Sequence, residues 1–285
     1  MGKAGTEGPG GRALIVATHR RSGTHWLMDL LMNNSQDIDR PYVALDRLLP
    51  DNSEHCALPK LEELLRSERV RLVKTHADAD LHAFRSASAE SREFAETLVA
   101  TQPVVTVVRD GRDVMVSLWH YRRAFDRQAA QQPFSDFLRA PSRIAHWVEH
   151  VVGWLAREGV IVVRYEDLHA DAEAVIRSVL AQLGLQAADR FSLVKIDDAV
   201  RARRPWQRAA RRLGLNRGSG LVTTAVEPRR GISGDWEAHF SPDDLAFYDG
   251  EVRKALSIAI ERAQLDESAA ARVTRMVTDS PLAVA

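Results

Sequence analysis

The sequence contains almost no cysteine, with Cys56 as the only one in 285 residues. A single cysteine excludes an internal disulfide and is typical of proteins from reducing compartments, so we expect a cytoplasmic protein. The sequence also lacks any apolar run near the roughly 20 residues that cross a bilayer, and no signal-peptide core follows the first residues. We therefore expect no stable insertion into a membrane.

An excess of one charge sign is also missing, because 39 Lys and Arg residues balance 39 Asp and Glu residues. A chain without net charge has no overall field that attracts nucleic acid or an acidic membrane surface, so we expect no nucleic-acid partner. The sequence also lacks clusters of Asp, Glu, His or Cys at metal-ligand spacing. We therefore predict a function that needs no metal.

The length and the two ends of the sequence bound its domain organisation. A chain of 285 residues forms one large α/β domain or two small ones. Residues 1–12 are rich in glycine and predict a disordered leader, although residues 1–6 also fit the loose myristoylation pattern. Beyond about Leu265 the pattern is weak, and we expect residues 266–285 to form a frayed C-terminal tail. The predicted domain spans residues 13–265.

One stretch near the N-terminus carries the clearest local pattern. Residues Ala13–Ala17 are an apolar run that predicts a buried strand, and apolar residues recur at helical spacing from Trp26 onward. The polar turn between them has Gly23 as its only glycine. A P-loop-like strand, turn and helix of this kind aims backbone N–H groups at an anion such as phosphate.

The side chains of this turn also suit an anion. Arg20 and Arg21 add positive charge, and Ser22 and Thr24 add hydroxyl donors. On these residues alone, an anion site and an ordinary surface turn both stay open. The Walker A loop of ATP and GTP hydrolases is disfavoured, because Thr24 follows Gly23 where that loop has its lysine.

Further apolar runs predict three more strands, at residues 70–73, Val104–Val108 and 160–163. Residues 33–59 are predicted to be polar and irregular. Helices are expected at residues 59–66 and 89–100, from Asp113 onward, around Phe134–Leu138, at residues 143–157, in the stretch ending at Leu183, and from Ser241 onward. Because strands alternate with helices, we expect an α/β fold with a single, mostly parallel sheet and helices on both faces.

Polar side chains follow each of the four predicted strands. Arg21 follows the first strand, Lys74 and His76 follow the second, Arg109 follows the third and Tyr165 follows the fourth. Ligands of parallel α/β sheets bind at the carboxyl ends of the strands. We therefore expect these side chains to converge on one site.

Five short motifs resemble those of PAPS-dependent sulfotransferases and occur in that family's order. Residues 18–26 resemble the loop T-Y-P-K-S-G-T-T-W, which binds the 5′-phosphosulfate of 3′-phosphoadenosine 5′-phosphosulfate (PAPS). Residues 74–76 match the K-T-H that carries the catalytic base. Residues 108–117 are similar to the segment whose arginine and serine bind the 3′-phosphate. Residues 165–167 match a Y-E-D whose tyrosine contacts adenine, and residues 229–236 resemble R-K-G-x-x-G-D-W, which returns to the 3′-phosphate.

The resemblance implies a nucleotide site and a reaction. The residues implied to bind PAPS, or the product 3′-phosphoadenosine 5′-phosphate (PAP), are Arg21, Ser22, Gly23, Thr24, His25, Trp26, Arg109, Ser117, Tyr165, Arg229, Arg230 and Gly231. Trp26 and Tyr165 are expected to sandwich or edge the adenine. The implied reaction is in-line transfer of the sulfuryl group to a hydroxyl or amine of a small-molecule or glycoside acceptor. His76 is implied as the general base, with Lys74 and Arg21 stabilising charge at the sulfuryl group.

Three departures from the family pattern modify these expectations. Arg21 stands where the family has lysine, and arginine cannot donate a proton near neutral pH, so its help to the leaving group is electrostatic. Arg20 and His19 replace a proline and an aromatic residue. The dimer segment of the cytosolic relatives, K-x-x-x-T-V-x-x-x-E, is absent after Trp236. That dimer is therefore not supported, and the oligomeric state stays open.

Other interpretations stay open as well. His76 fits a structural histidine, and the segment 119–121 fits either a helix core or the wall of an acceptor pocket. The seven arginines within residues 201–217 fit a solvated helix, an RNA- or polyanion-binding arm, or a mobile basic flap over 201–226 that covers the cofactor or an anionic acceptor. For the whole chain, the alternatives are a protein that senses an adenosine phosphate without catalysis and a P-loop small-molecule kinase.

Overall fold

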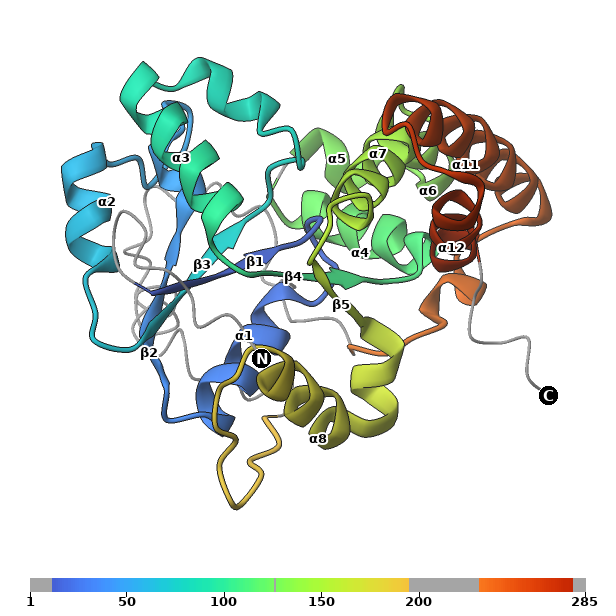
Figure 1. Ribbon diagram of the computed structural model, residues 1–285. Helices are drawn as coiled ribbons and strands as arrows, with labels where there is room; N and C mark the ends of the chain where they lie inside the picture. Colours follow the sequence, from blue (N-terminus) through green and yellow to red (C-terminus); the bar gives the residue numbers. More distant parts are fainter. Residues whose placement is uncertain (1–11, 126, 195–230, 279–285) are drawn as a thin grey trace, which may run out of the picture.

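The computed structural model describes residues 12–125, 127–194 and 231–278 (Figure 1). Its centre is a five-stranded sheet in the order β2-β3-β1-β4-β5. The strands are β1 Ala13–Ala17, β2 Ile38–Ala44, β3 Val70–Thr75, β4 Val104–Val108 and β5 Ile161–Arg164. All neighbouring strands are parallel, which confirms the predicted α/β fold. The basic flap predicted at 201–226, and all of the predicted leader except residue 12, lie outside the described residues.

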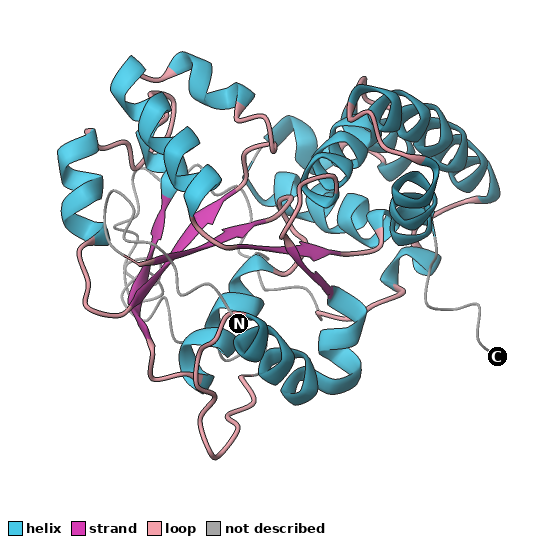
Figure 2. Ribbon diagram, in the orientation of Figure 1, coloured by secondary structure: helices cyan, strands magenta, loops and turns pink. Residues whose placement is uncertain are grey.

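The central strand β1 is apolar throughout because helices cover both faces of the sheet (Figure 2). Its side chains alternate between two cores. Leu14 and Val16 share one core with helices α1 Thr24–Asn34 and α8 Tyr165–Gln182. Ile15 shares the other core with α2 Leu58–Leu65 and α3 Ala89–Thr101. The rigid sheet between these layers therefore holds the carboxyl end of β1, where the predicted anion loop begins.

The remaining helices lie mostly beside β4 and β5, where most of them share a third core (Figure 1). They are α4 Gly111–Phe125, α5 Arg127–Gln131, α6 Phe134–Leu138, α7 Arg143–Leu155, α11 Pro242–Arg262 and α12 Glu267–Thr278. Short 3-10 helices are formed by η1 Leu45–Leu48, η2 His82–Ser86 and η3 Asp235–Ala238. Among the described residues, no helix combines the length and apolarity that crossing a membrane requires.

The prediction of an irregular stretch over residues 33–59 is wrong where β2 runs. This strand lies at the edge of the sheet, so only one side of its backbone pairs, with β3. An edge strand tolerates polar side chains and a proline, and Arg40 and Pro41 are exposed here. The local sequence therefore lacks the apolar run that marks the buried strands.

The expectation of a frayed chain beyond Leu265 is wrong for residues 267–278, which form α12. Val273 and Val277 lie one turn apart and are buried in the core shared with α7 and α11. Two buried positions are a weak pattern in the sequence, and the helix is stabilised by tertiary packing that only the folded chain supplies.

Candidate functional site

The loops after β1 and β4 meet in the middle of the sheet. These two strands are neighbours, and the chain continues from them to strands at opposite edges, β2 and β5. Two loops that leave adjacent strands in opposite directions open a crevice, and parallel α/β sheets bind ligands at this place. Residues 18–23 and Arg109 lie at this crevice because they follow the ends of β1 and β4.

The loop after β1 has a shape that requires glycine at Gly23. Gly23 has a φ of 101°, and a Cβ at this position would lie 2.6 Å from Cδ2 of Tyr165. The hydroxyls of Thr18 and Thr24 are hydrogen bonded to each other, which closes the base of the loop. Ser22 Oγ is buried and has no hydrogen-bond partner among the described residues. The loop thus holds a buried hydroxyl beside the start of α1, as an anion site would.

Arg109 connects three parts of the site. Its Nη1 donates to the backbone oxygen of Arg21 at 3.0 Å, and its Nη2 donates to that of Ile232 at 3.1 Å. Its guanidinium carbon lies 4.4 Å from the ring centre of Tyr165. The side chain is only 10% exposed, so these contacts form in a partly desolvated space. Arg109 therefore ties the loop after β1, the start of α8 and the segment after residue 230 together.

Asp113, in the first turn of α4, fixes the same segment from the other side. Its carboxylate accepts hydrogen bonds from the backbone of Gly234 at 2.9 Å and Trp236 at 3.0 Å. It also lies 3.7 Å from Nη2 of Arg109. Burial raises the pKa of Asp113, against the charge of Arg109 and the two backbone donors. Asp113 was predicted to start a helix but not to belong to the site, although it lies inside the segment 108–117.

Arg21 and Ser117 are brought into direct contact. Arg21 Nε donates to Ser117 Oγ at 3.0 Å, and its guanidinium carbon lies 5.2 Å from the ring centre of Tyr121. Burial, followed by the nearby charge of Arg109, lowers the pKa of Arg21. Two guanidinium groups this close repel each other unless an anion binds between or beside them. The sequence placed Arg21 and Ser117 at opposite ends of the nucleotide and did not predict their pairing.

The aromatic residues of the site pack on one another. The hydroxyl of Tyr165 donates to the backbone oxygen of Gly231 at 3.1 Å, and Trp26 Nε1 donates to that of Val194 at 2.9 Å. The rings of Trp26 and Tyr165 meet edge to face with centres 5.7 Å apart. This direct contact fits the expected edge contact with adenine better than the sandwich, and both stay predictions. His25 is exposed.

His76 is held as a neutral imidazole next to the loop. Its Nδ1 lies 2.7 Å from the backbone oxygen of Thr18. A carbonyl only accepts, so Nδ1 carries the hydrogen and Nε2 carries the free electron pair. Burial, followed by the charge of Lys74, lowers the pKa of His76 to about 3, against the effect of the hydrogen bond that His76 donates to Thr18. Backbone N–H of His76 also donates to Asp46 Oδ2 at 3.1 Å, which anchors the residue to η1.

Three further histidines, His19, His146 and His150, lie near His76 and were not predicted as a group. The His19 ring is 5.4 Å from that of His150 and 5.7 Å from that of His146. Burial lowers the pKa of His19 to about 3 and that of His150 well below its usual value. His146 and His150 are four residues apart and therefore share one face of α7, which is the signal that the sequence contained.

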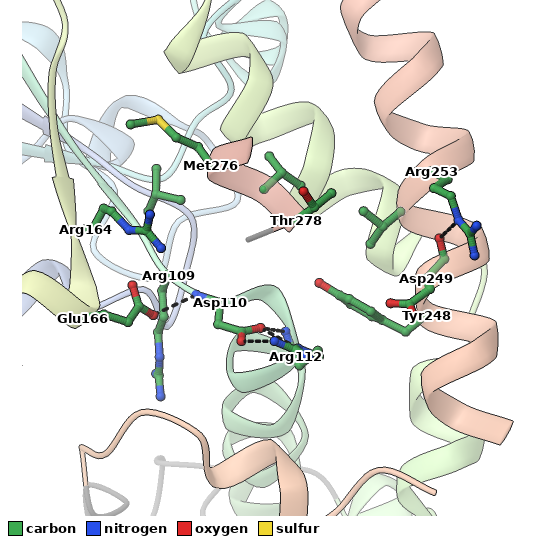
Figure 3. Close-up of a pocket in the computed structure, with 13 residues that line it drawn as sticks. Arg109, Asp110, Arg112, Arg164, Glu166, Tyr248, Asp249, Arg253, Met276 and Thr278 are labelled. Carbon is green, nitrogen blue, oxygen red and sulfur yellow. Dashed lines mark hydrogen bonds and ion pairs between the residues drawn. The ribbon is translucent and has the colours of Figure 1, made fainter. Parts of the chain in front are cut away.

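A hollow of about 340 Å³ lies between the ends of β4 and β5 and helices α11 and α12 (Figure 3). Its wall carries both charge signs, including Arg164, Glu166 and Asp249, together with the hydroxyl end of Tyr248. Of the described residues predicted for the site, only Arg109 lines it. The crevice between the loops after β1 and β4, rather than this hollow, therefore gathers the predicted residues.

Two of the residues predicted for the site are not among the described residues. Arg229 and Arg230 lie outside the described residues, and Gly231 is the first residue after that gap. Lys74 lies near the end of β3, opposite Val16 of β1. In the described part of the chain, no group of three or more His, Cys, Asp or Glu side chains is placed to hold a metal ion.

Comparisons with known proteins agree with this geometry. The family model described as "Sulfotransferase domain" matches residues 12–258. Mouse "Sulfotransferase 2A6" is 26% identical over 250 residues, covering 83% of this chain and 81% of that protein. The "3-beta-hydroxysteroid sulfotransferase" of Cavia porcellus is 25% identical over 237 residues, covering 80% and 77%.

A solved structure has the same fold. Mouse sulfotransferase SULT7A1 complexed with PAP matches with a TM-score of 0.59 and 17% identity, covering 93% of this chain and 88% of that one. At this identity the match concerns the fold, while the family model covers most of the chain, including the loops after β1, β3, β4 and β5. The chain therefore belongs to the sulfotransferase domain family.

Proposed function

We propose that this sulfotransferase moves the sulfuryl group of PAPS to a hydroxyl or amine of an acceptor, with His76 as general base. The observation that carries the proposal is the convergence at one crevice. Arg109 donates to the backbone of Arg21, and His76 donates to the backbone of Thr18 in the same loop. An anion-binding loop and a neutral base are thus joined by direct hydrogen bonds. The PAP named in the SULT7A1 complex supports the same nucleotide here.

We assign the nucleotide to two groups of residues. The 5′ end is bound by the loop after β1, comprising Arg21, Ser22, Gly23, Thr24, His25 and Trp26. The 3′-phosphate is bound by Arg109, Ser117, Gly231 and the undescribed Arg229 and Arg230, with Tyr165 at the edge of adenine. Charged donors and hydroxyls of this kind suit a ligand with several phosphate oxygens.

The chain's side chains supply the acid–base and electrostatic parts of the reaction. Nε2 of His76 accepts the proton of the acceptor hydroxyl or amine. The freed oxygen or nitrogen forms a bond to sulfur, and the bond between sulfur and the 5′-phosphate oxygen breaks. Lys74 and Arg21 stabilise the charge that develops on the sulfuryl and phosphate oxygens. Because arginine keeps its proton, Arg21 helps the leaving group by charge alone.

Calorimetry and a transfer assay test the proposal. We expect PAP to bind without Mg²⁺ and labelled sulfate to pass from PAPS to phenols, alcohols, amines or glycosides. Tighter binding of ATP with Mg²⁺ than of PAP, together with phosphate transfer, would indicate the small-molecule kinase instead. PAP binding without transfer to any acceptor would indicate a nucleotide sensor. The cytoplasmic location and the domain limits at residues 13 and 265 stay predictions.

The pH profile provides a second test. The pKa of His76, at about 3, lies below the ordinary value of 6.5, so this base stays neutral through mildly acidic pH. We expect the acid limb of kcat/KM to fall below about pH 5, since kcat/KM reports the groups of the free enzyme. A limb with its midpoint near the ordinary histidine value would contradict the assigned environment of His76.

The profile must be measured with a check on folding. His19, His76 and His150 have lowered pKa values, so the unfolded chain binds more protons than the folded one as the pH falls. The free energy of unfolding therefore decreases from about the ordinary histidine pKa downward. Circular dichroism at each pH separates loss of the fold from protonation of the base.

A further inference from the structure

One face of α7 runs along the site and ends at an arginine. Arg143, His146 and His150 are spaced by three and four residues, which places them in one stripe on the helix. His150 and His146 contact the ring of His19 in the loop after β1. Further along the helix, Trp154 Nε1 donates to the backbone oxygen of Ala77, just after His76. The stripe therefore faces the loops after β1 and β3, with Arg143 at its outer end.

Arg143 is an arginine without an acidic partner in the described part of the chain. Its Nε is buried and has no hydrogen-bond partner among the described residues. Its guanidinium carbon lies 3.6 Å from the ring centre of Phe137, which holds it in place. No carboxylate of the described residues forms an ion pair with it, whereas the neighbouring Arg139 pairs with Asp244.

A second arginine adds to the charge at this place. Arg122, near the end of α4, is close enough that its charge, after burial, contributes to lowering the pKa of Arg143 to about 10. Arg122 is exposed and also forms no ion pair with the described residues. Two like charges without a counter-charge destabilise each other, and an anion bound between them removes that cost.

Two acidic groups lie near His146, in the middle of the stripe. Asp78, in the loop after β3, and Glu149 on α7 act on each other, and the charge of His146 acts on Asp78. Burial raises the pKa of Asp78, against the opposing influence of His146. Neither carboxylate forms an ion pair with Arg143. Arg143, at the positive end of the stripe, is thus available to bind an anionic ligand.

The spacing along the helix sets the size of that ligand. Arg143 and His150 are seven residues apart, which corresponds to about 10 Å along a helix axis. The charge of His76 acts on both His150 and His19, so the stripe passes close to the base. A group bound at Arg143 therefore lies on the order of 10 Å from the level of the base.

We infer that Arg143 and Arg122 form an anion subsite of the acceptor pocket, and that the acceptor carries a carboxylate at the end opposite to its sulfated hydroxyl or amine. The forked guanidinium of Arg143 suits the two oxygens of a carboxylate. The inference rests on the proposed function and names the class of acceptor for it: a phenolic acid, or a glycoside with an acidic sugar.

Matched acceptors test the subsite. Sulfate transfer from labelled PAPS is measured with para-hydroxyphenylpropanoate against its amide, and with phenyl glucuronide against phenyl glucuronamide. The members of each pair differ in the carboxylate and keep their hydroxyls. We expect kcat/KM to be about tenfold or more higher for the carboxylates, because charge-assisted hydrogen bonds of this strength are lost with the uncharged member. Salt should reduce the preference.

Substitutions of the two arginines test whether they cause the preference for carboxylate acceptors. Arg143→Gln should bring the ratio of the two kcat/KM values close to one, mainly through a higher KM for the carboxylate, and Arg143→Lys should keep part of the preference. Arg122→Gln should have a smaller effect because Arg122 is exposed. Arg272→Gln, at an exposed arginine on α12, is the matched control and should leave the ratio unchanged.

The outcomes separate the two proposals. A wild-type enzyme that prefers the uncharged member of both pairs, or a preference that survives Arg143→Gln, overturns the subsite. So does PAP binding in calorimetry combined with no reaction of either carboxylate. Failure of PAP itself to bind would instead overturn the proposed function. Calorimetry with PAP on each variant also shows whether it retains the folded nucleotide site.

Discussion

His76→Asn should lower kcat by about 10²–10⁴-fold and leave the affinity for PAP nearly unchanged. The asparagine amide can still donate to the backbone oxygen of Thr18, where Nδ1 of His76 donates now at 2.7 Å. The loop after β1 therefore keeps its contact, while the electron pair of Nε2 is lost. Steady-state transfer assays give kcat, and calorimetry with PAP gives the affinity.

The control for this substitution lies six residues along the chain. His82 is exposed at the start of η2, and His82→Ala should leave both kcat and PAP affinity unchanged. If His76→Asn weakens PAP binding as much as it lowers activity, His76 holds the loop and is not the base. If activity survives within a few-fold, another group accepts the proton.

Arg109→Met should weaken PAP binding by about 100-fold or more, since each charge-assisted hydrogen bond contributes strongly. The substitution removes the donors to the backbone of Arg21 and Ile232 and the charge beside Asp113. Asp113 then stays buried without its neighbouring cation, which adds a cost of its own. Calorimetry with PAP is the direct measurement, and thermal unfolding reports the loss of stability.

A conservative variant separates the contribution of the Arg109 charge to PAP affinity from that of its forked shape. Arg109→Lys keeps the charge but loses the fork that reaches two carbonyl groups, so its PAP affinity should lie between those of the wild type and Arg109→Met. Arg272→Met, on the exposed face of α12, should leave PAP binding intact. An affinity of Arg109→Met within a few-fold of wild type would place the nucleotide away from Arg109, and the assignment of the crevice would fail.

Most of the sheet could be predicted from the sequence because its strands are buried on both faces. The apolar runs at β1, β3, β4 and β5 identify these strands without any tertiary information. The start of α11 could also be predicted from local sequence, since Ser241 and Asp244 form a capping box within four residues. The edge strand β2 and helix α12 were missed, because their stability comes mainly from neighbours distant in sequence.

The site was only partly predictable for the same reason. The polar residues after each strand and the sulfotransferase-like motifs located the crevice, because strand ends of a parallel sheet share one edge. The pairing of Arg21 with Ser117 joins residues 96 positions apart, and no local pattern encodes it. The contact of His19 with His150 depends likewise on how α7 packs over the loop after β1.

The sequence by itself determined the fold class, the family motifs and the residue types that we propose meet the nucleotide, since periodicity and short motifs are local properties of the chain. Only the tertiary structure decided which nitrogen of His76 is free, which carbonyls Arg109 holds, and that Arg143 has no ion pair with a described carboxylate beside Arg122. These features depend on distances and burial between elements, and such distances are set by the packing of helices on the sheet rather than by any one segment.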